Sequence, residues 1–168
     1  DRDDLVASDH LAAAGLLGAE VRDRAAVGVN AQRGQLPCYD AASAAEGGGA
    51  ARLLAAEAAE PQDLLEASGY LFVCPENLGS MSGPMKDLFD RCYYPVLGRI
   101  EGRSYATIIA AGSDGQGAQA QIDRIVTGWR LRRVAEPLIA RMEAQTPQAI
   151  LAEKQVSPQV LAKAAELG

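Results

Sequence analysis

The sequence predicts an α/β domain in which a parallel sheet of about five strands lies between two layers of helices, a three-layer sandwich. Two continuous apolar runs, Tyr70–Cys74 and Tyr105–Ala111, predict it, because strands buried on both faces lack the alternation of half-exposed strands. The roughly 30 residues between these runs are the length of one strand–helix–strand crossover. We therefore expect the two strands to be parallel neighbours at the centre of the sheet.

The composition is that of a globular chain. With 168 residues, of which 48% are hydrophobic and 23% charged, a single domain spanning residues 1–168 with a full core is expected. Residues 1–50 are atypical, since they are rich in alanine and glycine. The net charge of −6 argues against nucleic acid and anionic membrane as partners, because both require a basic patch.

Cysteine usage and the lack of a long apolar run predict a cytoplasmic location. Cys38, Cys74 and Cys92 are odd in number and widely spaced, so neither a disulfide framework nor a C-x-x-C metal site is expected. No apolar run approaches the roughly 20 residues that span a bilayer. The acidic start of the sequence is also the reverse of a signal peptide.

Four further elements are predicted before residue 70. Asp4–Leu17 is expected to be a helix, and the weak apolar run Ala25–Val29 the first core strand. Ala51–Leu54 predicts a short strand. Pro61–Ala67 predicts a helix, because proline suits the first helical turn and Asp63 follows close behind.

The elements after residue 74 follow the same alternation. Pro75 is expected to end the first long strand, and Gly83 and Pro84 to open a helix that ends near Pro95. Apolar residues at spacings of three and four give this helix one buried stripe: Met85, Leu88, Phe89 and Cys92. The remaining expected elements are a helix over Gln119–Trp129, a strand around Arg133–Ala140, and a terminal helix Gln159–Leu167 capped by Ser157 and Pro158.

Two polar, glycine-rich loops follow the two strongest strands, Pro75–Gly83 and Gly112–Gly117. In open parallel α/β sheets, ligands bind outside the carboxyl ends of the strands, so both loops are expected to face one ligand. Their glycines let the backbone approach closely and present N–H groups. Either loop is also compatible with a plain strand-to-helix connection, since Gly, Pro and Ser are ordinary turn residues.

The stretch Asp63–Leu138 resembles the superfamily of NAD(P)H-dependent FMN reductases, quinone oxidoreductases and flavodoxins. The likeness centres on P-E-N-L-G-S-M-S-G-P-M-K-D-L-F-D-R, with a weaker match in A-A-G-S-D-G-Q-G. It implies a flavodoxin-like sandwich with FMN as cofactor and NAD(P)H as co-substrate. It places Pro75, Glu76, Asn77, Leu78, Gly79 and Ser80 along the isoalloxazine ring, and Gly112, Ser113, Asp114 and Gly115 at its pyrimidine side.

The flavin itself would carry the chemistry, so no catalytic side chain and no metal ligand is expected. A side chain added at Gly79 or Gly115 is expected to weaken FMN binding more than it lowers stability. The family's phosphate loop, rich in serine, threonine and glycine, has no counterpart in residues 1–50. The nearest substitute is Asn30–Gly34, in which Arg33 supplies a charge.

Three functions remain open at this point. The first is an FMN-dependent oxidoreductase that passes electrons from NAD(P)H to a quinone, a flavin or a similar small-molecule acceptor. The second is a flavodoxin-type electron carrier, which the acidic charge suits. The third is a degenerate relative that has lost FMN. A homodimer or homotetramer is left open, and the arginine cluster Arg130, Arg132 and Arg133 is either a solvated helix end or a phosphate site for the nicotinamide nucleotide.

Overall fold

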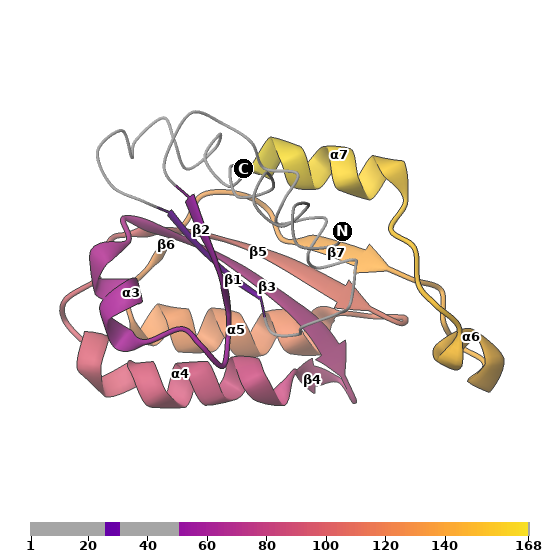
Figure 1. The fold of residues 1–168 in the computed structure, drawn as a ribbon, viewed down its shortest axis with the longest axis horizontal. Coiled ribbons are helices and arrows are strands. Elements are labelled where there is room, and N and C mark those ends of the chain that lie inside the picture. Colours follow the sequence, from indigo (N-terminus) through magenta and orange to yellow (C-terminus); the bar gives the residue numbers. More distant parts are fainter. Residues whose placement is uncertain (1–25, 31–50, 168) are drawn as a thin grey trace, which may run out of the picture.

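The computed structural model describes residues 26–30 and 51–167, which form a parallel sheet with helices on both faces (Figure 1). The central strand β3 pairs with β1 on one side and with β5 on the other, both in parallel. The strand order β2-β1-β3-β5-β6 changes direction between β1 and β3. The strands are β1 (Ala26–Asn30), β2 (Ala51–Ala55), β3 (Gly69–Asn77), β5 (Ser104–Ala111), β6 (Arg132–Arg133) and β7 (Leu138–Arg141).

The sheet confirms the three-layer sandwich and the parallel pairing of the two apolar runs. Tyr70 lies opposite Tyr105 in the register of β3 and β5. One face of the sheet is covered by α4 (Gly83–Val96) and α5 (Gln116–Gly128), with α3 (Pro61–Glu66) beside α4, and the other by α7 (Pro158–Leu167) (Figure 1). Within the described part, no helix combines the length and apolarity needed to cross a bilayer.

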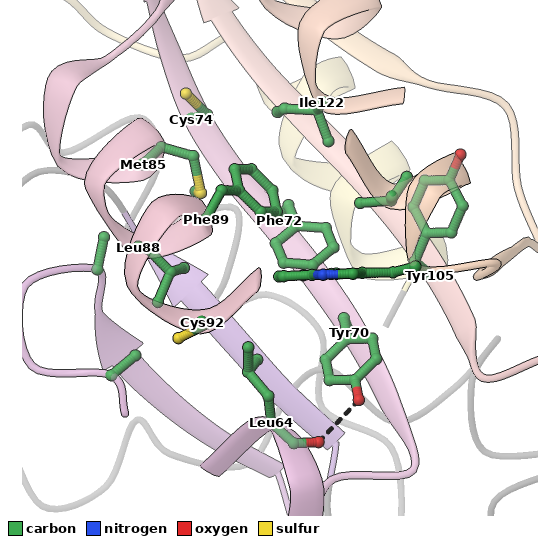
Figure 2. Packing of buried hydrophobic residues seen from close by; sticks show 14 of the residues in the cluster. Leu64, Tyr70, Phe72, Cys74, Met85, Leu88, Phe89, Cys92, Tyr105 and Ile122 are labelled. Carbon is green, nitrogen blue, oxygen red and sulfur yellow. Dashed lines mark hydrogen bonds between the residues drawn. The ribbon is translucent and has the colours of Figure 1, made fainter. Parts of the chain in front are cut away.

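Strand β3 is buried on both faces, which is why its sequence is continuously apolar. Tyr70, Phe72 and Cys74 pack toward α4 and α5, whereas Leu71 and Val73 belong to a second cluster on the side of α7. Figure 2 shows the first cluster, in which the Tyr70 hydroxyl donates to the Leu64 carbonyl oxygen at 2.7 Å.

An aromatic stack joins the sheet to its two long helices. The ring centroids of Phe72 and Phe89 lie 5.2 Å apart, and those of Phe89 and Trp129 lie 5.3 Å apart. All three side chains are at most 1% exposed. The predicted stripe of α4 is confirmed, because Met85, Leu88, Phe89 and Cys92 are all buried.

The structure corrects several expected boundaries. Strand β3 does not end at Pro75 but continues to Asn77, since β4 pairs with Glu76 and Asn77 beyond the proline. Helix α5 begins three residues before Gln119. The single strand expected around Arg133–Ala140 is two short strands, because Pro137 interrupts the run.

Two short elements have no counterpart in the sequence predictions, β4 (Ser80–Met81) and α6 (Pro147–Leu151). The strand expected at Ala25–Val29 is confirmed as β1 within one residue at each end. The expected helix Asp4–Leu17 and the phosphate-loop substitute that follows Asn30 lie outside the described residues.

The aromatic stack predicts where the core is sensitive. Replacing Phe89 by alanine removes the ring between Phe72 and Trp129, and we expect the free energy of unfolding, measured in urea, to fall by about 3–5 kcal/mol. Tyr94→Ala, on the same helix at a side chain 81% exposed, is the matched control and should change it by less than about 0.5 kcal/mol. Equal effects of the two substitutions would contradict the packing described here.

Candidate functional site

A hollow of about 510 Å³ lies at the carboxyl ends of β3 and β5, in the size range of small-molecule sites. Its first wall is the end of β3, Pro75–Asn77, and its second is Ala110–Gly112 at the end of β5. The third wall comes from the segment after β7. That wall contributes Met142, Ala144, Ile150, Leu151, Ala152, Glu153 and Lys154.

A second hollow of about 530 Å³ adjoins the first and shares part of its lining. It extends the site along Leu78, Gly79 and Ser113. We call the two hollows together the trough. The lining residues common to both are Glu76, Asn77, Gly112, Ala144 and Ile150.

The third wall is fixed to β5 by its backbone. Past the end of β7, the Met142 N–H donates to the Ala111 carbonyl oxygen at 2.9 Å, and the Ala144 N–H donates to that of Gly112 at 2.8 Å. Lys154 closes the carboxyl end of α6, because its ammonium donates to the carbonyl oxygens of Ala149, Ile150 and Ala152 at 2.5–2.9 Å. This lysine therefore faces the trough with its charge already paired to helix carbonyls.

A tight hairpin forms the edge of the trough opposite this wall. Strands β3 and β4 pair antiparallel through Asn77 and Ser80, so that only Leu78 and Gly79 form the turn. Their φ angles are +54° and +72°, as a type I′ turn requires at both central positions. The left-handed conformation costs leucine roughly 1–2 kcal/mol, and its side chain is fully exposed.

The hairpin is bound to the start of α5 through side chains. The two carboxylate oxygens of Glu76 accept hydrogen bonds from the N–H groups of Gly115, at 2.8 Å, and Ala118, at 3.0 Å. From the second turn of α5, Gln121 accepts from the Met81 N–H at 2.9 Å and donates to the Ser80 hydroxyl at 3.2 Å. The two loops predicted to face one ligand are therefore held together.

Two glycines of α5 permit these contacts. A Cβ on Gly117 would overlap the carbonyl oxygen of Gly79, so a bare backbone is required for the hairpin to lie this close to the helix. Gly115 adopts φ +84° at the N-cap, and a Cβ there would overlap the Ile139 side chain. Bulk at Gly115 would therefore also disturb packing against Ile139 and Ala111, in addition to any effect on flavin binding. At Gly79 a Cβ would meet nothing within 4 Å.

The structure brings most of the predicted site residues together. Those that line the trough are Pro75, Glu76, Asn77, Leu78, Gly79, Gly112 and Ser113. Three others are used to shape the loops: the Ser80 hydroxyl accepts from Gln121, the Asp114 carbonyl oxygen accepts from Arg141 at 3.3 Å, and the Gly115 N–H is bound to Glu76.

The third wall was missed by the sequence predictions. Its signal was available in Thr146-Pro147, an N-cap residue followed by a proline at the first helical position, and the Thr146 hydroxyl does accept from the Ala149 N–H. Helix α6 has five residues and no buried side chain, so its sequence carries no apolar stripe to mark it as a helix.

The lining fits the ring of FMN. Ala110, Ala111, Gly112 and Ala144 give one part of the trough small side chains, and Gly79 in the hairpin turn leaves its backbone uncovered. A flat ring with polar edges requires this combination of close approach and peptide groups. The part of the chain expected to hold the phosphate lies outside the described residues.

Two other groups singled out in the sequence take no part in the trough. Burial raises the pKa of the Cys74 thiol, whose sulfur accepts from the Ser82 N–H at 3.4 Å, so this cysteine stays neutral and packs as a hydrophobe. Arg132 and Arg133 pair with Ser104 and Tyr105, at the amino end of β5. The arginine cluster therefore lies at the opposite end of the sheet from the trough.

A family model described as NADPH-dependent FMN reductase matches residues 31–140, well over half of the 168-residue chain. The matched range contains β3, β5 and both loops that line the trough. No curated protein sequence matches the chain.

Solved structures resemble the chain in fold at low sequence identity. A flavodoxin, WrbA-like protein from Agrobacterium tumefaciens has a TM-score of 0.64 at 17% identity, over 86% of this chain and 92% of that one. The NADPH-quinone reductase of P. pentosaceus has a TM-score of 0.59 at 14% identity, over 86% of this chain and 96% of that one. An NADH:FMN oxidoreductase in its apo form has a TM-score of 0.60 at 13% identity, over 86% of each chain. These similarities show that the fold is flavodoxin-like.

The close approach of Gly117 to the hairpin predicts a local intolerance of side chains. Gly117→Ala forces the Gly79 carbonyl to move, and we expect the free energy of unfolding to fall by about 1–3 kcal/mol, as for overpacked sites. Gly83→Ala is the matched control, because a Cβ there meets nothing within 4 Å. Thermal or urea unfolding measures both, and unchanged stability of Gly117→Ala would refute the contact.

Proposed function

Because the chain belongs to the NADPH-dependent FMN reductase family, we propose that it is an FMN-dependent oxidoreductase that passes electrons from NAD(P)H to a quinone, a flavin or a similar acceptor. One observation carries the proposal furthest. The two loops that resemble the family's flavin loops lie together on one trough, at the carboxyl ends of β3 and β5. This is where open parallel sheets bind cofactors.

The residues of the trough would bind and orient the cofactor. Bound FMN supplies the redox chemistry, which the chain tunes by contact and charge. Backbone groups of Leu78, Gly79 and Ser113 would meet the polar edges of the ring, and the small residues of β5 would allow its face to approach. The carboxylate of Glu76 is bound to α5, so we assign it no role as acid or base.

The electron carrier remains the second candidate, supported by the net charge of −6, which suits docking on basic partners. A cytoplasmic location and a homodimer or homotetramer also remain predictions. The small-molecule acceptor is proposed from membership of the NADPH-dependent FMN reductase family.

The absorption spectrum of the purified protein tests the proposed function. After incubation with FMN and desalting, we expect a flavin band in the blue that NADH or NADPH bleaches without oxygen and that a quinone restores. A band that neither nucleotide bleaches would favour the electron carrier. Failure to retain any flavin would favour a relative that has lost the cofactor.

A comparison of FMN with riboflavin tests the phosphate end of the site. Among the described residues that line the trough, Lys154 is the one basic side chain, and its ammonium is bound to carbonyl oxygens. The start of α5, a second place for an anion, is occupied by Glu76. We therefore expect similar dissociation constants for the two ligands.

Fluorescence titration of the apo protein measures this ratio. A preference for FMN of a hundredfold or more, equivalent to about 2.7 kcal/mol, would contradict the prediction. It would also show that a phosphate cradle exists in the part of the chain outside the described residues.

A further inference from the structure

Helix α5 is capped by a side chain from a distant strand. Its N-cap is Gly115, which has no side chain to accept the first free N–H groups. Glu76, 39 residues earlier in the sequence, accepts from Gly115 with one carboxylate oxygen and from Ala118 with the other. The negative charge of Glu76 also faces the positive end of the helix dipole.

This contact joins the two sides of the trough. Leu78 and Gly79 line it from the hairpin that Glu76 begins, while Gly112 and Ser113 line it from the loop that leads into α5. The carboxylate of Glu76 is the group that links the base of the hairpin to the N-cap of the helix. The Gln121 contacts lie beyond the turn, at Ser80 and Met81.

We propose that Glu76 is a positioning residue for the flavin ring, which sets the separation of the hairpin and the β5–α5 loop through its hydrogen bonds to Gly115 and Ala118. The inference rests on the proposed function, because it assumes that a ring occupies the trough. It differs from the role implied by the sequence resemblance, in which Glu76 lies along the isoalloxazine as a contact residue. Here its carboxylate is turned to the helix.

The geometry requires a carboxylate at this length of side chain. Glutamine has one acceptor oxygen and would bind one of the two N–H groups, while its own amide N–H₂ would face the other. Alanine would leave both N–H groups without this partner. The loss should weaken binding of the ring and leave the contribution of the phosphate unchanged, because Glu76 acts on loops that line the ring end of the site.

The experiment compares Glu76→Gln and Glu76→Ala with wild-type protein. The matched control is Glu101→Gln, at an exposed carboxylate paired with Arg130 at 2.9 Å near the amino end of the sheet. Fluorescence titration gives dissociation constants for riboflavin and FMN, and hydrogen exchange of the apo protein follows the amides of residues 77–81 and of β5.

We expect Glu76→Ala to bind both flavins at least about tenfold more weakly, the scale of one charge-assisted hydrogen bond, with an unchanged ratio of the two constants. Glu76→Gln should be intermediate and Glu101→Gln unchanged. Hairpin amides should exchange faster in both Glu76 variants while β5 amides stay protected. A merely stabilising side chain would change protection throughout the sheet and leave flavin affinity as it was.

Wild-type affinity for riboflavin in the Glu76 variants would overturn the inference. If Glu76→Ala does not fold, the near-isosteric Glu76→Gln decides by the same readouts. If the wild-type protein binds neither flavin, the proposed function fails, and hydrogen exchange alone tests whether Glu76 links the hairpin to α5. Unchanged exchange of the hairpin amides in Glu76→Gln would then refute this link, and faster exchange would support it.

Discussion

Burial of β3 on both faces is the constraint on which the rest of the structure depends. Its alternate side chains supply the aromatic stack beneath α4 and α5 and the aliphatic cluster beneath α7. Its edges pair with β1 and β5, so it also fixes the direction of its neighbours. The same strand then continues into the hairpin of the trough, so a strand buried on both faces sets the position of the site.

Much of the fold could be predicted because its signals are local. A few residues are enough to indicate which faces are buried, as in the apolar runs at Tyr70 and Tyr105 and the apolar stripe on α4. Boundaries were less accurate where tertiary pairing decides them. Strand β3 continues past Pro75 because β4 pairs with Glu76 and Asn77, and nothing in the residues around Pro75 shows this.

The site could be predicted only in outline. Loops at the carboxyl ends of neighbouring parallel strands must meet, and Asn77, Gly112 and their neighbours do line one trough. The direction of the Glu76 side chain could not be found in this way, because its partners lie on another element. Nor does spacing reveal that Gly115 is required by the core and Gly117 by the hairpin.

The hairpin and helix α6 differ in how far a substitution in either would disturb its neighbours. Gly117 lies close to both Gly79 and Glu76, so the effect of a substitution at one of these positions depends on the identity of the others. Helix α6 has no buried residue, and Ile150 and Leu151 are exposed. Divergence in ligand preference among relatives would therefore accumulate on α6, one residue at a time, while the hairpin side stays as it is.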